Sequence, residues 1–160
     1  MKKTKPKSIL LKTEGLCWLR FAKQCDLVCT EAGIWNADVL GATETFTVEV
    51  EVKVDKADLV REFREKKAKH AYYNHGLPGW TPSYFYVMVP SDLASVAKEI
   101  LAEHNPKYGL VSYSGVGRAG ERCRIVKPAR KLHDGKPSPQ LRRAVLRRMG
   151  SELCNLHGLL

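Results

Sequence analysis

One short run of the chain alternates strictly between apolar and charged side chains. It consists of Val48, Glu49, Val50, Glu51, Val52, Lys53 and Val54. A period of two predicts a β-strand with valines on one face and two carboxylates and an ammonium group on the other. An interior strand of a small domain normally turns each face to water or to the apolar core. Valines on one face with two acids and a lysine on the other therefore predict a polar cleft along the charged face. The alternative is an edge strand whose solvated charges guard against aggregation.

A second extended run, residues 35–41, precedes this strand and carries Asp38. Residues 41–45 are short and turn-like, so the two runs are expected to pair as a hairpin. The hairpin brings Asp38 across from Glu49 and Glu51, and three carboxylates then converge with the lysine of the second strand.

Carboxylates at close range repel and raise each other's pKa unless a cation lies between them. Magnesium is the natural candidate, because it is bound through one or two carboxylates together with water and substrate phosphates. Lys53 lies on the same face, where an ammonium group can orient an attacking water or stabilise charge on a phosphate. The pattern therefore predicts a Mg²⁺ site, with Mn²⁺ as a substitute.

The rest of the chain alternates predicted helices and strands. Apolar spacing and capping residues predict helices over about 8–24, after Asp55, over 93–101 and after Ser138, and apolar runs predict strands at 25–30, 84–89, 108–114 and 122–126. A strand, a helix and a strand follow one another between residues 48 and 84, which favours a right-handed crossover between parallel strands. The sequence thus predicts an α/β fold with a mixed sheet flanked by helices.

Two of these helices have an apolar side and a basic side. The apolar positions are Leu59, Val60 and Phe63 in the first, and Leu141, Val145, Met149 and Leu156 in the second. The basic positions proposed for DNA binding are Lys66, Lys67, Lys69, Arg142, Arg143, Arg147 and Arg148. Both basic sides are compatible with phosphate contact and with an ordinary solvated surface, and the last helix is also compatible with oligomerisation.

Length and charge restrict the class of protein. The 160 residues suffice for one domain with a real core. We expect a basic flexible arm at 1–8, the main domain at 9–134 and a basic C-terminal helix packed on it at 135–160. Lys and Arg number 27 against 17 Asp and Glu, a net charge of +10, which favours DNA or another polyanion as partner. A homodimer is as compatible with the sequence as a monomer.

The expected location is the cytoplasm. No apolar run approaches the ~20 residues that cross a bilayer, and the N-terminal residues lack the apolar segment of a signal peptide. The five cysteines are an odd set without CxxC spacing, which favours reduced thiols over a disulfide framework.

Residues 115–120 spell GxGxxG. A dinucleotide-binding fingerprint must open a helix after a strand, whereas this segment lies between two predicted strands. We therefore expect a hairpin loop.

Three further carboxylates are candidates for the metal site. Glu49 shares the strand face of Glu51, Glu31 lies near the turn before Asp38, and Glu14 lies on the first predicted helix. Glu14 has no local motif around it, and an exposed surface position is its more common environment.

The order Asp38, hairpin, Glu51-x-Lys53 resembles the PD-(D/E)xK nuclease superfamily. In that superfamily the aspartate and the glutamate bind a divalent metal and the lysine assists hydrolysis. The resemblance implies a restriction-endonuclease-like fold, with Asp38, Glu51 and Lys53 as catalytic residues and Asp38 and Glu51 as metal ligands. Ala37 stands where the superfamily pattern has proline.

The order of segments looks more specifically like the MmcB-type DNA repair family of this superfamily. Short matches run from about residue 9 to residue 150, and they include segments 30–31, 37–39, 50–53, 69–73, 84–90, 108–111 and 126–129. His70 stands where that family has tryptophan.

Two hypotheses follow from residues and resemblance together. The first is a magnesium-dependent deoxyribonuclease that acts in DNA repair or recombination. The second is a DNA-binding accessory module that has the nuclease fold and little or no catalysis. An RNA-binding protein is a weaker third reading, because the chain has no RNA-binding signature.

Overall fold

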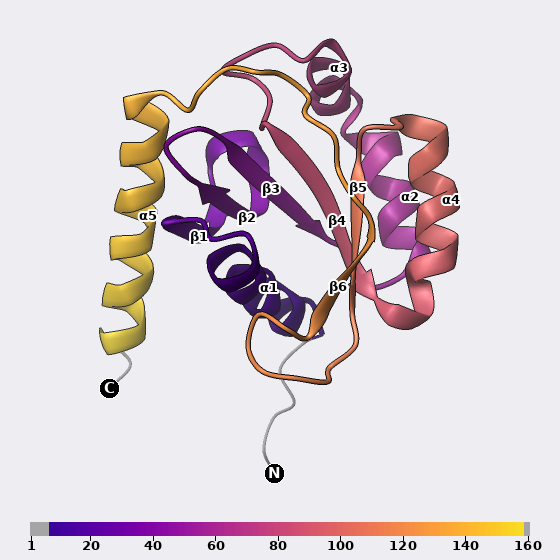
Figure 1. Cartoon of the computed structure of the whole chain (residues 1–160), viewed down its shortest axis with the longest axis horizontal. Coiled ribbons are helices and arrows are strands. Elements are labelled where there is room, and N and C mark those ends of the chain that lie inside the picture. The colour runs from indigo at the N-terminus through magenta and orange to yellow at the C-terminus, as the bar shows by residue number, and fades with distance from the viewer. Residues whose placement is uncertain (1–6, 159–160) are drawn as a thin grey trace.

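The computed structural model describes residues 7–158, which form a six-stranded sheet with helices on both faces (Figure 1). The strands follow chain order in the sheet: β1 (Leu27–Ala32), β2 (Ala37–Ala42), β3 (Thr47–Val52), β4 (Tyr84–Pro90), β5 (Gly109–Tyr113) and β6 (Cys123–Lys127). The helices are α1 (Lys7–Cys17), continued by a π-helical turn (Trp18–Ala22), α2 (Lys56–Glu65), α3 (Lys67–His75), α4 (Ala94–His104) and α5 (Pro139–Gly158). The predicted α/β fold is confirmed.

The sheet is mixed. β1, β2 and β3 are successively antiparallel, β3, β4 and β5 are parallel, and β6 runs antiparallel to β5. In the β2–β3 hairpin Leu40 pairs with Glu49, so Asp38, two residues earlier, lies across from Glu51 on the same face of the sheet. The predicted hairpin and the parallel strand–helix–strand connection are confirmed.

One face of the sheet is covered by α1 and its π-helical turn. Val48, Val50 and Val52 of β3 pack there against Leu11 and Leu19. Because the strand alternates strictly, burial of these valines turns both intervening glutamates to the opposite face. The pleat of β3 therefore decides where the acidic residues lie.

The opposite face carries two separate groups of helices. Leu59 of α2 and Leu101 of α4 pack with Phe85 of β4, whereas Val145 of α5 packs with Leu40 of β2. Figure 1 accordingly shows α5 beside β1, at the far side of the sheet from α2 and α4. The charged face of β3 lies between these two groups.

The GxGxxG segment joins β5 to β6, which confirms the predicted hairpin loop. Its glycines have φ angles of +77° at Gly115, +110° at Gly117 and +87° at Gly120. Such angles favour glycine, so the motif serves the turn.

Local boundaries differ from prediction at four places. The single helix expected after Asp55 is broken at Lys66, so Lys67 and Lys69 lie on a separate helix, α3. Trp35 and Asn36 are not extended: they belong to a 3-10 turn (Ile34–Asn36) and have φ angles of +58° and +50°. β3 ends at Val52, so Lys53 follows the strand. Lys7 and Ser8 are helical, although an arm was expected over 1–8; residues 1–6 of that arm lie outside the described residues.

Two apolar residues do not face the core as predicted. Val60 on α2 and Leu156 on α5 are exposed. The buried side of α2 consists of Leu59, Phe63 and a charged residue, Glu62. A hydrophobic pattern assigns charged residues to the outside, and here a buried ionic network overrides it.

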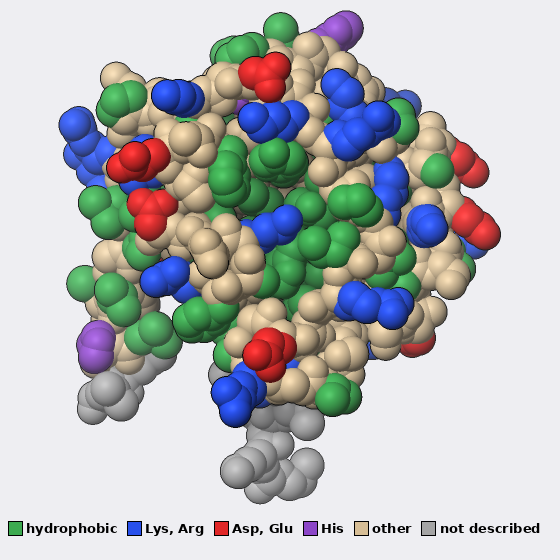
Figure 2. All heavy atoms as spheres, in the orientation of Figure 1, with side chains coloured by type: hydrophobic (Ala, Val, Ile, Leu, Met, Phe, Trp, Pro, Cys, Tyr) green, Lys and Arg blue, Asp and Glu red, His purple; other side chains and the backbone are tan. Residues whose placement is uncertain are grey.

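Basic side chains are spread over the face shown in Figure 2 and do not gather in a single patch there. Among residues 7–158, no helix is long and apolar enough to cross a membrane. The five cysteines, all within the described residues, are unbridged.

Candidate functional site

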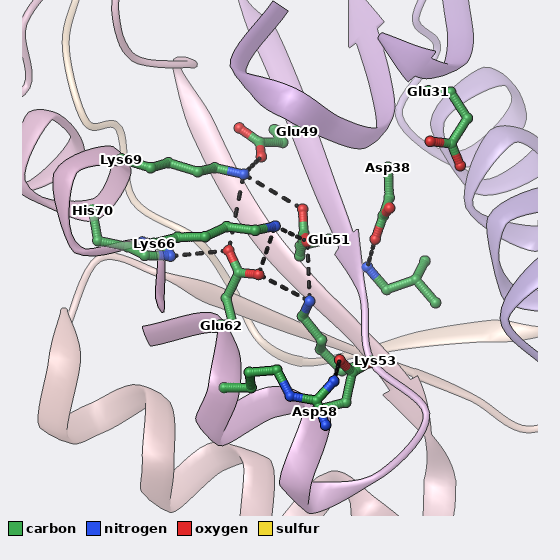
Figure 3. A network of polar contacts seen from close by, with 12 residues as sticks. Glu31, Asp38, Glu49, Glu51, Lys53, Asp58, Glu62, Lys66, Lys69 and His70 are labelled. Atoms are coloured by element: carbon green, nitrogen blue, oxygen red, sulfur yellow. Dashed lines mark hydrogen bonds and ion pairs between the residues drawn. The ribbon is translucent and has the colours of Figure 1, made fainter. Parts of the chain in front are cut away.

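The charged face of β3 is buried. Glu49 and Glu51 are 0% and 1% exposed, and Lys53, just beyond the strand, is 6% exposed. The backbone N–H of Lys53 donates to the carbonyl of Met88 at 3.0 Å, which holds the lysine against the sheet after the strand has ended. Helices α2 and α3 lie over this face and supply the remaining charged groups (Figure 3).

Three lysine ammonium groups surround the Glu51 carboxylate. Lys53 and Lys66 contact Oε1 at 3.0 and 2.8 Å, and Lys69 contacts Oε2 at 3.4 Å. Glu62 of α2 pairs with the same cations, at 2.9 Å from Lys53 and 2.8 Å from Lys66. We call Glu49, Glu51, Glu62, Lys53, Lys66 and Lys69 the ionic cluster; three carboxylates face three ammonium groups in it.

Burial and opposite charge work against each other at the lysines. Burial alone would lower the pKa of Lys53, Lys66 and Lys69, but the neighbouring glutamates outweigh it and raise the pKa of all three. Burial would raise the pKa of Glu62, but its hydrogen bond from His70 and its lysine contacts lower it. These four groups are therefore charged at neutral pH.

Glu49 differs from the other carboxylates of the ionic cluster. Its side chain is fully buried, and burial raises its pKa from 4.5 to about 7 even though Lys69 lies beside it. The hydroxyl of Tyr73 donates a hydrogen bond to Oε2. Glu49 is thus the acid of the cluster whose charge changes near neutral pH.

His70 connects the ionic cluster to the core. Its Nε2 lies 3.1 Å from Glu62 and its Nδ1 lies 2.7 Å from the Tyr108 hydroxyl. A carboxylate only accepts hydrogen bonds, so Nε2 carries the proton and Nδ1 accepts from the tyrosine. Burial lowers the pKa of His70, which keeps the ring neutral. Its role here is to orient Glu62.

Asp38 lies at the edge of the ionic cluster. Its Oδ2 accepts a hydrogen bond from the backbone N–H of Val52 at 2.9 Å, and its Oδ1 lies 3.2 Å from the Lys12 ammonium group of α1. Lys12 also pairs with Glu31, whose side chain is 58% exposed. Asp38 is therefore hydrogen-bonded to the end of β3, and Lys12 links it to Glu31.

Asp38, Glu51 and Lys53 line one open cavity of about 300 Å³, together with Lys12, Glu62 and Lys66. The sequence predicted that Asp38, Glu49, Glu51 and Lys53 would converge. The structure brings Asp38, Glu51 and Lys53 to this cavity, which we call the acidic cavity, whereas Glu49 does not line it. It opens to solvent between α1 and α2.

Two carboxylates of the acidic cavity are of the ligand type that a hard divalent cation prefers. Asp38 and Glu51 provide carboxylate oxygens, and magnesium needs only one or two such ligands when water and phosphate complete its shell. Among residues 7–158, no group of three or more His, Cys, Asp or Glu is placed to hold a metal ion by itself. Lysine contacts to Glu51 would have to rearrange for this carboxylate to ligate a cation.

Glu14 lies elsewhere, and the expected surface position was wrong. It is 3% exposed, and Arg122 contacts its Oε1 at 2.7 Å beside the β5–β6 loop. It does not line the acidic cavity. Of the three further carboxylates, only Glu49 belongs to the ionic cluster.

The basic residues proposed for DNA binding divide into two groups. Arg143, Arg147 and Lys67 are exposed. The others make internal contacts: Lys66 and Lys69 in the ionic cluster, Arg142 with Asp26 at 2.9 Å, and Arg148 with the Thr30 carbonyl at 2.9 Å. Arg142 and Arg148 thus also fasten α5 to β1.

Sequence analysis missed Glu62 as a member of the site. The available signal was its position three residues after Leu59 and next to Phe63, within the buried stripe of α2. Lys12 was also missed, and no local pattern marks it, because its partners come from β1 and β2.

No family model matches the chain, and no curated protein matches it. A solved structure of a protein of unknown function, SPO1766 from Silicibacter pomeroyi, is similar in fold, with a TM-score of 0.58 at 16% sequence identity. The match covers 96% of this chain and 89% of that one. At this identity the likeness concerns the fold alone. It shows that the α/β architecture of this chain also occurs in a solved protein structure.

Proposed function

We propose that this protein is a metal-dependent DNA nuclease of the PD-(D/E)xK superfamily. The observation that carries the proposal is that Asp38, Glu51 and Lys53 line one open cavity at the end of a β-hairpin. Two carboxylates are enough to hold a magnesium ion whose shell is completed by water and phosphate, and a charged lysine beside them can stabilise the phosphate. The net charge of +10 supports a polyanionic substrate.

Each residue has a role in this proposal. Asp38 and Glu51 would hold the Mg²⁺ or Mn²⁺ ion. A bound magnesium ion supplies Lewis-acid stabilisation of the phosphate and lowers the pKa of a coordinated water. Lys53 keeps its proton beside Glu51 and Glu62, so its ammonium group can orient water and stabilise negative charge on a phosphate oxygen.

Glu62 and His70 would act as positioning residues. Glu62 holds Lys53 and Lys66 at the cavity, and His70 fixes the Glu62 carboxylate through Nε2. Repair or recombination is the setting that the sequence resemblance implies for such an activity.

A second candidate is the DNA-binding accessory module. It is favoured by the three lysine contacts to Glu51, since these neutralise the carboxylate without a metal ion. Under this proposal the ionic cluster stabilises the fold and the exposed basic residues bind DNA.

One experiment distinguishes the two functions. Labelled single-stranded, duplex, flap, fork and four-way-junction DNA is incubated with Mg²⁺ or Mn²⁺ and wild-type protein, Asp38→Asn or Glu51→Gln. The nuclease predicts metal-dependent cleavage that both variants lose while they still bind DNA. The accessory module predicts salt-sensitive binding of DNA and no cleavage by any of the three proteins.

A further inference from the structure

We infer that an aromatic cavity beside the ionic cluster binds an unpaired base of single-stranded DNA. The cavity has a volume of about 380 Å³ and is lined by Trp35, Tyr72 and Trp80 together with Lys66 and Lys69. The inference names the substrate class of the proposed nuclease site and thus rests on that function, although base binding can be measured without cleavage.

The first support is an exposed pair of stacked rings. Tyr72 and Trp80 are 42% and 62% exposed, their centroids are 5.4 Å apart and their planes are inclined by 22°. Stacked aromatic rings open to solvent offer a flat surface of the kind on which nucleobases stack.

The second support is that this platform is held in place before any ligand binds. The Thr81 hydroxyl donates to the Tyr72 carbonyl at 3.1 Å, which ties the loop carrying Trp80 to α3. The backbone N–H of Trp80 donates to the Leu77 carbonyl at 3.1 Å, and Gly79 turns the chain with φ +84°. A preorganised platform loses little conformational freedom on binding.

The third support is the backbone of Trp35. Its φ and ψ angles are +58° and +11°, and Asn36 follows with φ +50°. Left-handed angles cost a residue with a side chain about 1 kcal/mol or more, and such strain is concentrated at functional sites. Here the strained turn places Trp35 at both the aromatic cavity and the core.

The fourth support is charge at the boundary with the proposed catalytic residues. Lys66 lines the aromatic cavity as well as the acidic cavity, and its side chain is 35% exposed. Figure 3 shows Lys69 of α3 and Lys66, between α2 and α3, extending toward Glu51. A nucleotide with its base on the platform would have its phosphate near these lysines and the acidic cavity.

The geometry selects single strands over duplex. In a duplex each base is covered on both faces by its neighbours, so only an unpaired base or an extruded one can stack on Tyr72 and Trp80. The cavity thus predicts a preference for single-stranded DNA or for junctions with unpaired nucleotides.

The test measures binding of a labelled oligothymidylate and a labelled duplex by fluorescence anisotropy in EDTA, which excludes metal-dependent cleavage. Wild-type protein is compared with Trp80→Ala, Trp80→Phe and Phe21→Ala. Phe21 is the matched control, because it is an aromatic residue that is 60% exposed and does not line the cavity. Circular dichroism checks that each variant is folded.

Trp80→Ala is expected to weaken oligothymidylate binding by about 5- to 150-fold, the range that base stacking gives. Trp80→Phe should restore most of it, and Phe21→Ala and all duplex affinities should change less than about 2-fold. The inference is overturned if wild type does not bind the oligonucleotide, or if Trp80→Ala lowers both affinities equally or neither. If Trp80→Ala weakens oligothymidylate binding as expected but wild type cleaves no DNA in Mg²⁺, base binding stands and the proposed nuclease is refuted.

Discussion

Replacing Glu62 by Gln removes one charge from the centre of the ionic cluster and nearly preserves the side-chain volume. The Glu62 carboxylate contacts Lys53 at 2.9 Å, Lys66 at 2.8 Å and His70 at 3.1 Å. The amide oxygen of Gln can still accept from His70, so the main loss is charge. Two lysines would then share Glu51 as their remaining partner at these distances.

The expected cost is about 3 kcal/mol. Removing one partner of a buried ion pair costs ~3–5 kcal/mol, and the low end applies because Lys66 is one-third exposed and water screens part of the effect. With a urea m value of about 2 kcal/mol/M, the unfolding midpoint of Glu62→Gln should fall by about 1.5 M.

Glu65→Gln on the same helix is the matched control. Glu65 is 60% exposed and pairs at 3.5 Å with Arg64, which is 67% exposed. Exposed pairs contribute little, so this variant should lose less than about 0.5 kcal/mol. Equal urea midpoints for the two variants would refute the claim that the ionic cluster depends on a buried Glu62 charge.

Two further stability predictions concern other positions. Burial raises the pKa of Glu49 from 4.5 to about 7, so the stability that this group contributes is complete below pH 4.5 and is lost as pH rises through about 7. Relative to Glu49→Gln, wild type should therefore lose up to about 3 kcal/mol between pH 4.5 and 8 in urea unfolding, and a pH-independent difference would contradict this. In Gly41→Ala a new Cβ would lie 2.8 Å from Cys25 Sγ, so we expect a thermal-unfolding cost of about 1–3 kcal/mol. Gly33→Ala, where a new Cβ would meet no atom within 4 Å, should cost much less. The opposite order would be inconsistent with close packing of β2 against Cys25.

The strand that carries the acidic residues was predictable because its information is local. Alternation of apolar and charged residues along 48–53 fixed which side chains share a face, and the turn at 41–45 fixed the hairpin that brings Asp38 to Glu51. The structure agrees with both. These features depend on neighbours in the chain, which a sequence pattern records directly.

The partners of that strand were not predictable in the same way. Glu62 was hidden in an apolar stripe where Val60 was expected to face the core, and Val60 is exposed. Lys66 and Lys69 were placed on a basic side proposed for DNA binding, yet both turn toward Glu51. Their direction depends on how α3 lies over the sheet, which is a long-range property.

The aromatic cavity was equally invisible to pattern analysis. Trp35 was placed in an extended run, because nothing in the sequence marks its left-handed turn, and no sequence pattern links it to Trp80. The two residues are 45 positions apart in the chain, and the fold brings them to one cavity.

The most direct test of the central claim is the rate of cleavage of labelled single-stranded and branched DNA in Mg²⁺ by wild type and Lys53→Met, with Lys98→Ala, an exposed position on α4, as control. Met keeps the aliphatic stem of Lys53 and removes its ammonium group. We predict magnesium-dependent cutting by wild type and the control that Lys53→Met loses while it still folds and binds DNA. Cutting by Lys53→Met at the wild-type rate would contradict the assignment of this site.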